Sequence, residues 1–201
     1  LDSARNELFN LIQNYIDETL LATREVPSIH PKVMPRGGYT LPLGEKVYEQ
    51  IESRDQFVKH RVYGGWFRSL FTEESFDSYT GEYVLARLLN TTPGIEWWHR
   101  LHPQDHAFVH YNAKHRYFPD FVALDTNGVH WIIEGKAERG RDDIQVQAKR
   151  KAAEDLVRRL VAEEAYAGQH WGYLIAYEQD TARADSWEDL KAFSQPVSNA
   201  L

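Results

Sequence analysis

The chain has 201 residues, of which 42% are hydrophobic and 13% aromatic, with no cysteine and a formal net charge of −7. This size and apolar content can support a real core, which excludes a disordered chain, and the lack of cysteine excludes disulfides and thiolate metal sites. No segment approaches the roughly 18 apolar residues of a membrane span, and no signal-peptide pattern is present, so we expect a soluble, cytoplasmic protein without a membrane partner.

Residues 1–74 are expected to form an N-terminal extension that packs on the core. Apolar positions from Asp2 to about Thr23 recur at helical spacing, and the proline- and glycine-bearing stretch over 27–44 indicates an irregular arm. The glycine pair in "YGGWFRSLF" predicts a turn beside packing residues, with no chemistry assigned. Because the chain opens with Leu1 directly in a helical pattern, we expect it to be a piece of a longer protein.

Residues 75–201 are expected to form one domain that begins with a helix. The stretch "SFDSYTGEYVLARLLN" predicts this helix, with Ser78 or Thr80 able to cap it. Its apolar stripe is expected to consist of Val84, Leu85, Leu88 and Leu89.

Short strands are predicted next, because the apolar residues alternate or form short runs between turn signals. The expected strands are "IEWWHRL" (95–101), "HAFVHYN" (106–112), "RYFPDFVAL" (116–124) and "VHWIIEGKA" (129–137). The turn "DTNG" joins the last two of these strands.

A long helix from about Asp142 to Tyr166 and a last strand, "HWGYLIAY" (170–177), complete the domain. The helix is expected to present an apolar stripe at four-residue steps, made of Ile144, Ala148, Ala152, Leu156 and Leu160. The order of elements, helix, strands, helix and strand, predicts an α/β class fold, an α+β arrangement with a mixed sheet.

The predicted hairpin brings acidic residues together on one face. Side chains alternate along a strand, so Glu134 and Lys136 share a face. A three-residue loop over 126–128, closed by Gly128 with positive φ, would pair residue 125 with 129 and therefore Asp120 with Glu134. A two-residue loop would place Asp120 on the other face.

Two neighbouring carboxylates inside apolar segments repel each other unless a cation lies between them. Mg²⁺ or Mn²⁺ prefers carboxylate and carbonyl oxygens, which Asp120, Glu134 and the backbone carbonyl of Gly135 could supply. The ammonium group of Lys136 could stabilise charge on a phosphoryl oxygen. The pattern predicts metal-dependent phosphodiester chemistry. A catalytic Lys136 also predicts that Lys136→Ala folds nearly normally and does not cut.

The motif of Pro119-Asp120, thirteen further residues and Glu134-Gly135-Lys136 resembles the signature of the PD-(D/E)xK nuclease superfamily. The order of elements is similar to the αβββαβ core of restriction endonucleases. More narrowly, residues 75–177 resemble the C-terminal nuclease domain of type III restriction subunits and related helicase-nuclease defence proteins. Glycine between the acid and the lysine departs from the usual bulky apolar residue.

This resemblance implies a DNA endonuclease with a helicase or ATPase motor in the same full-length chain. It implies that Asp120 and Glu134 bind the metal, that Lys136 is catalytic, and that Glu82 on the first core helix completes the site. Basic side chains outnumber acidic ones between residues 136 and 159, which suggests that this helix follows phosphates. The predicted DNA-binding residues are Gln145, Lys149 and Lys151.

Two other functions remain open from the sequence. The same fold could serve as a catalytically inactive nucleic-acid-binding or docking module, which the acidic net charge and Gly135 favour. A histidine metalloenzyme is the other alternative, because five of the nine histidines lie at positions 99, 102, 106, 110 and 115. His106 and His110 have the spacing of a helical zinc pair, but as strand residues they would lie roughly 13 Å apart.

Overall fold

The computed structural model describes residues 10–12, 15, 29–30, 46–112 and 114–199. Most of the helix predicted near the N-terminus, and nearly all of the irregular arm that follows it, lie outside the described residues. The described part combines helices with a mixed sheet, so the α/β class prediction is confirmed at this level.

A five-stranded mixed sheet forms the centre of the described part, with the strand order β3-β6-β7-β8-β9. Its strands are β3 (Ile95–Arg100), β6 (Phe121–Asp125), β7 (Val129–Lys136), β8 (His170–Tyr177) and β9 (Val197–Ser198). β7 and β8 run parallel, while the other neighbouring strands are antiparallel. The parallel pair requires a long crossover, which contains the helix α3 (Ile144–Leu160).

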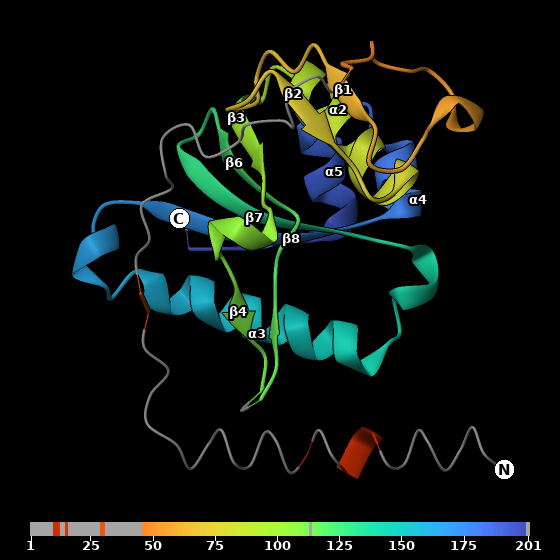
Figure 1. Ribbon diagram of the computed structural model, residues 1–201. Helices are drawn as coiled ribbons and strands as arrows, with labels where there is room; N and C mark the ends of the chain where they lie inside the picture. The colour runs from red at the N-terminus through yellow and green to blue at the C-terminus, as the bar shows by residue number, and fades with distance from the viewer. Residues whose placement is uncertain (1–9, 13–14, 16–28, 31–45, 113, 200–201) are drawn as a thin grey trace, which may run out of the picture.

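Helices cover both faces of this sheet. Figure 1 shows α3 on one side, with α2 (Leu85–Thr91), α4 (Glu178–Arg183) and α5 (Trp187–Ser194) on the other. A π-helical turn, η2 (Tyr79–Val84), leads into α2. Single 3₁₀ turns are η1 (Arg54–Gln56), η3 (Pro103–Asp105), η4 (Glu138–Gly140) and η5 (Glu164–Tyr166).

Two small hairpins lie outside the main sheet. The first pairs β1 (Val62–Gly64) with β2 (Glu73–Ser75), and the second pairs β4 (Val109–His110) with β5 (Arg116–Tyr117). β2 spans the predicted domain boundary at residues 74 and 75. Tyr63, from the predicted extension, belongs to the same buried cluster as the core helix α2.

The sheet separates two apolar cores. The larger core is rich in aromatic rings and includes Trp66, Tyr83 and Trp98, which are fully buried. The smaller core lies between the sheet and α3, and its members include Ile132 and Tyr173. Because both faces are covered, β7 has few exposed positions and reads in the sequence as an apolar run.

The β6–β7 hairpin has the register predicted from the sequence. Phe121 pairs with Ile133 and Leu124 with His130. Gly128 has a φ of 79°, as the three-residue loop requires, and its amide donates to the carbonyl of Asp125 at 3.0 Å. The Asp125 carboxylate is buried and also accepts from the indole of Trp131 at 2.9 Å, so the turn is anchored in the core.

The single strand predicted over 116–124 is divided between β5 and β6, which belong to different sheets. Three further local predictions need correction, two of which concern the first helix and the strand over 106–112. Ser78 occupies the N-cap position, but neither it nor Thr80 caps the helix through its side chain. The carbonyl of Ser78 instead accepts from the amide of Tyr83, five residues along, which produces the π turn. The predicted strand shrinks to β4, because η3 and the left-handed residue His106 (φ 53°) occupy the preceding positions.

The third correction concerns the long helix, which ends at Leu160, with η5 following as a separate turn. Its buried residues are Ala153, Val157 and Leu160, whereas Ile144 is exposed. Of the predicted stripe, Leu160 is buried and Ala152 and Leu156 pack against the core, so the prediction holds for the second half of the helix. A strict four-residue step overshoots a full helical turn by about 40°, which carries the stripe away from the sheet at Ile144.

None of the helices in the described ranges combines the length and apolar character needed to cross a bilayer.

Candidate functional site

Asp120 and Glu134 lie opposite each other where the β6–β7 hairpin opens. Continuing the observed register by one residue from Phe121 and Ile133 places them face to face. The amide of Asp120 donates to the carbonyl of Ile133 at 3.1 Å, and its Oδ2 accepts from the amide of Gly135 at 2.8 Å. The strand parity predicted from the sequence therefore brings the two carboxylates to one side of the sheet.

Glu134 and Lys136 form a close ion pair on this face. Lys136 Nζ lies 2.6 Å from Glu134 Oε1, and the carboxylate is almost fully buried at 2% exposure. The Tyr173 hydroxyl donates to Glu134 Oε2 at 3.4 Å. Glu134 is thus desolvated and held from two sides, while Lys136 keeps part of its side chain open to solvent.

Gly135, between the acid and the lysine, contacts the backbone of η2. A Cβ at residue 135 would lie 1.8 Å from the carbonyl oxygen of Gly81. Only glycine fits this approach, which explains the departure from the bulky apolar residue that the resembled motif usually has. The contact also brings the next residue, Glu82, toward the site.

Glu82 is buried, and Arg100 holds its carboxylate. Arg100 donates to Glu82 Oε2 from two nitrogens, at 2.8 and 3.2 Å, and to Asp77 Oδ2 at 2.9 Å. The amide of Asp77 also donates to Glu82 Oε2, at 2.8 Å. These contacts orient Glu82 and neutralise part of its charge.

The electrostatics of the site reflect this crowding of acids. Burial, together with Glu134 and then Glu82, raises the pKa of Asp120 to about 7, even though Lys136 acts in the opposite sense. Burial alone would lower the pKa of Lys136, but Glu134, Asp120 and Glu82 outweigh it and hold that pKa above its ordinary value. The acids therefore make the site favourable for cations.

The residues predicted as metal ligands are brought together in part. Asp120 and Glu134 are neighbours, and Glu82 is close enough to affect the pKa of Asp120. Within the described ranges, however, no three His, Cys, Asp or Glu side chains are gathered as a preformed metal cluster. The donor chemistry of Asp120 and Glu134, two desolvated and mutually repelling carboxylates, fits a hard divalent ion.

The predicted DNA-binding residues lie on the first half of α3. Asp143 caps the helix by accepting from the amides of Gln145 and Val146 at 2.8 and 3.1 Å. Gln145 and Lys151 are exposed. Lys149 Nζ instead lies over an aromatic ring of the β4–β5 hairpin, 5.6 Å from the centre of Tyr111.

The histidines of the rival zinc hypothesis lie in different environments. His106 follows η3 in a left-handed conformation, whereas His110 is on β4. His99 and His102 contact Asp105 at 3.3 Å and Glu74 at 2.9 Å, respectively. No cluster of three metal ligands contains them among the residues that the structure describes.

The sequence patterns did not identify Arg100 and Asp77 as residues of the site. Arg100 ends β3 opposite Phe121, and the next amide, that of Leu101, donates to the carbonyl of Asp120 at 2.8 Å. A buried arginine at the end of an aromatic strand was the available signal, because such a charge needs a partner.

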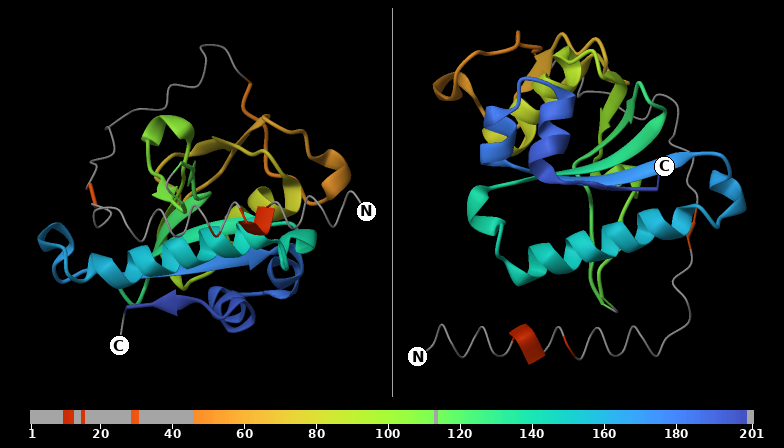
Figure 2. Two further views of the ribbon diagram at one scale, coloured as in Figure 1. Left: turned by 90° about the horizontal axis from the view of Figure 1, so that it is seen from below. Right: turned by 180° about the vertical axis from the view of Figure 1, so that it is seen from behind.

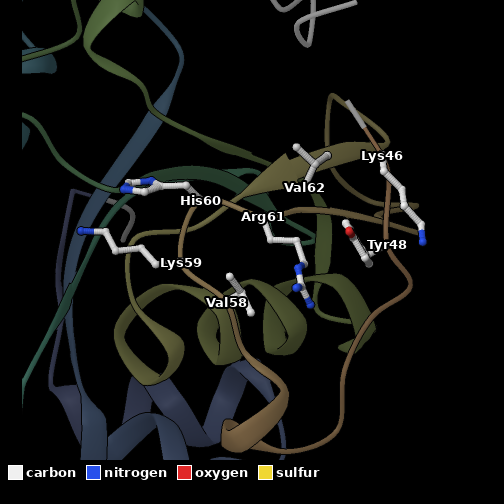
Figure 3. Close-up of a pocket in the computed structure, with 7 residues that line it drawn as sticks. All are labelled: Lys46, Tyr48, Val58, Lys59, His60, Arg61 and Val62. Atoms are coloured by element: carbon white, nitrogen blue, oxygen red, sulfur yellow. The ribbon is translucent and has the colours of Figure 1, made fainter. Parts of the chain in front are cut away.

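A basic cleft of about 310 Å³ lies in the N-terminal part of the described chain (Figure 3). Its lining residues are Lys46, Tyr48, Val58, Lys59, His60, Arg61 and Val62. Lys59 and His60 contact Asp77 Oδ1 at 3.6 and 3.1 Å, so the residue that binds Arg100 also binds two residues that line this cleft.

No family model, curated protein or solved structure matches this chain at the significance required. Function is therefore inferred from the arrangement of Asp120, Glu134 and Lys136.

Proposed function

We propose that this chain is a metal-dependent deoxyribonuclease domain of the PD-(D/E)xK superfamily, which hydrolyses phosphodiester bonds in DNA. One observation carries the proposal. Asp120 and Glu134 face each other at the open end of the β6–β7 hairpin, with Lys136 beside Glu134 and the pKa of Asp120 raised to about 7. Such a perturbed carboxylate beside a lysine is typical of functional sites.

The order of the elements supports the restriction-endonuclease-like core. A helical segment made of η2 and α2 precedes β3, β6 and β7, and α3 connects β7 to the parallel strand β8. This matches the αβββαβ order of the resembled family. The acids also lie at the open end of the hairpin, and β7 is the central strand of the sheet, held in place by β6 on one side and β8 on the other.

Asp120 and Glu134 would hold the Mg²⁺ or Mn²⁺ ion, and Glu82 and the Gly135 carbonyl are the further candidate ligands. When bound, such an ion supplies positive charge to the phosphate undergoing hydrolysis. Lys136 has a raised pKa and is therefore protonated at neutral pH. Its role is to donate to a phosphoryl oxygen as negative charge develops, rather than to act as a base.

The partners follow from the resemblance. DNA is the substrate, with Gln145, Lys149 and Lys151 as candidate contacts on α3. A helicase or ATPase motor in the same full-length protein would deliver the DNA to the site.

Plasmid cleavage tests the proposal. The chain is expected to nick or linearise supercoiled plasmid with Mg²⁺ or Mn²⁺ and to stop when EDTA is added. Asp120→Asn and Glu134→Gln should lower the rate by about 100-fold or more. Asp142→Asn removes an exposed acid near the start of α3 and should cut normally. A metal-independent rate, or equal rates for Asp120→Asn and Asp142→Asn, would exclude this site.

A catalytically inactive nucleic-acid-binding or docking module is the second candidate. The close pair of Lys136 with Glu134 favours it, because the lysine already balances one acid. So does the finding that the described residues contain no preformed cluster of three metal ligands. Isothermal titration with Mn²⁺ separates the two functions, since this module would bind DNA but would show no metal binding that depends on Asp120.

A further inference from the structure

The β4–β5 hairpin and its flanks, residues 106–112 and 114–118, form a projecting arm. Figures 1 and 2 show the strands of this hairpin crossing α3. The arm contains no acidic residue, although the chain as a whole is acidic. Its basic and histidine residues are His106, His110, Lys114, His115 and Arg116, which are all exposed.

Aromatic rings hold cations on this arm without neutralising them. The Arg116 guanidinium lies over Phe108, 4.7 Å from the ring centre, and 5.5 Å from the ring centre of Phe118. Lys149 reaches the arm from α3 and lies 5.7 Å from the ring centre of Tyr117. Neither Arg116 nor Lys149 forms an ion pair with an acid in the described part of the chain. Cation–π contacts position a charge while leaving it available for a phosphate.

Contacts within the chain hold the described residues of the arm in place. Near its tip, Asn112 Oδ1 accepts from the amides of Lys114 and His115 at 3.0 and 2.7 Å, and from His115 Nδ1 at 3.0 Å. At its base, Val109 and Tyr117 are buried in the core that includes α3. Holding these residues in place lowers the entropy lost on binding.

The arm also leads straight into the candidate site, since Tyr117 is only three residues before Asp120. We propose that the arm is a nucleic-acid-binding element, an inference that rests on the proposed function. In it, Lys114 and Arg116 contact backbone phosphates of the DNA strand presented to Asp120. The Arg116 guanidinium already covers Phe108, so charge rather than base stacking provides most of the binding. DNA binding by the arm is therefore independent of base sequence and sensitive to salt.

The basic cleft of Figure 3 is a weaker candidate for this role. Two of the side chains that line it, Lys59 and His60, share Asp77 as a partner. The arm offers Lys114 and Arg116 with no acid of its own, which favours the arm as the phosphate contact.

Fluorescence anisotropy with labelled oligothymidine, in EDTA and over a series of KCl concentrations, tests this inference without cleavage. The double variant Lys114→Gln/Arg116→Gln should bind about 10-fold or more weakly, and the slope of log K against log salt should fall by about 1.4, the loss expected for two phosphate contacts to a single strand. Arg54→Gln/Arg183→Gln changes the net charge equally on exposed residues outside the arm and α3 and should bind like wild type. Arg116→Lys keeps the charge and should keep the slope.

Several outcomes would overturn the inference. These are no binding by the wild-type chain at low salt, equal losses in the two double variants, or a fall in the salt slope for Arg116→Lys. If Lys114→Gln/Arg116→Gln lost binding to polyglutamate and to DNA equally, the arm would have a general preference for acidic polymers, which would also overturn the inference. Cleavage is a separate readout. If the chain binds DNA through the arm but never cuts, this inference stands and the proposed nuclease function fails. If the chain cuts but its arm variants bind DNA normally, the nuclease function stands and this inference fails.

Discussion

The carbonyl oxygen of Gly81 occupies the space where a side chain at residue 135 would begin, only 1.8 Å from an ideal Cβ built on Gly135. This contact joins η2 to the strand that carries Glu134 and Lys136. It ties the position of Glu82 to the absence of a side chain one residue before the end of β7.

Gly135→Ala should therefore push η2 away from β7. We expect a loss of about 1–3 kcal/mol in the free energy of unfolding, as for overpacked cores, together with slower cleavage because Glu82 moves. Chemical denaturation measures the first effect and plasmid cleavage the second. Gly140→Ala is the matched control, because its Cβ would meet only Val146, at an ordinary 3.6 Å. Equal stability of the two variants would contradict the close contact.

Asp120→Asn should stabilise the metal-free chain near and above neutral pH while abolishing cleavage. The raised pKa of Asp120, about 7, means that its contribution to stability is fully present below the unfolded value near 3.8 and is lost as pH rises through 7. Asparagine keeps an oxygen for the Gly135 amide but carries no charge. Melting curves in EDTA should show wild type losing more stability than Asp120→Asn between pH 5 and 8.

The control for this pH series is Asp142→Asn, which removes an exposed acid and should follow wild type. A wild-type chain that gains stability relative to Asp120→Asn over the same range would reverse the predicted sign. In wild type, added Mn²⁺ should raise the melting temperature more at pH 8 than at pH 6, because metal binding needs the deprotonated carboxylate.

Lys136→Ala tests the ion pair with Glu134. The pair found here changes the expectation that this variant folds nearly normally, because a buried Glu134 would lose its partner in the metal-free chain. Removing one member of a buried pair costs about 3–5 kcal/mol, and the partial exposure of Lys136 places the loss toward the lower end. Mn²⁺ should restore part of the melting temperature but not cleavage. Lys59→Ala, at an exposed pair, should change little. Wild-type cleavage by folded Lys136→Ala would remove Lys136 from the proposed chemistry.

Arg100→Met should destabilise the fold strongly, by about 3–5 kcal/mol, because it leaves Glu82 buried without its main partner. The double variant Arg100→Met/Glu82→Leu should recover much of this loss, since neither charge then remains. A double-mutant cycle in denaturant measures the coupling energy between the two residues. If Glu82 also serves the site, the recovered double variant still fails to cut. Strictly additive single effects would show that the pair is not coupled.

The sequence predicted the β6–β7 hairpin well because its signals are local. Alternation places Glu134 and Lys136 on one face, and Gly128 supplies the positive φ of a three-residue loop, so the register that pairs Asp120 with Glu134 needed no distant information. The longer patterns were less reliable. The four-residue steps correctly gave Ala152, Leu156 and Leu160 as core-facing residues of α3 but wrongly included Ile144, because the helical repeat is 3.6 residues rather than four.

Tertiary structure alone decided which partners complete the site. Arg100 meets Glu82 across 18 residues of sequence, and the backbone of Gly81 meets Gly135 across a greater separation. The cation on Arg116 is shared between the rings of Phe108 and Phe118. Local sequence determines the direction in which each side chain leaves its strand or helix. The distance between two such side chains depends on how helices and strands pack. Many pairs of apolar surfaces could bury each other, and only the close packing of the assembled core determines which pair does so.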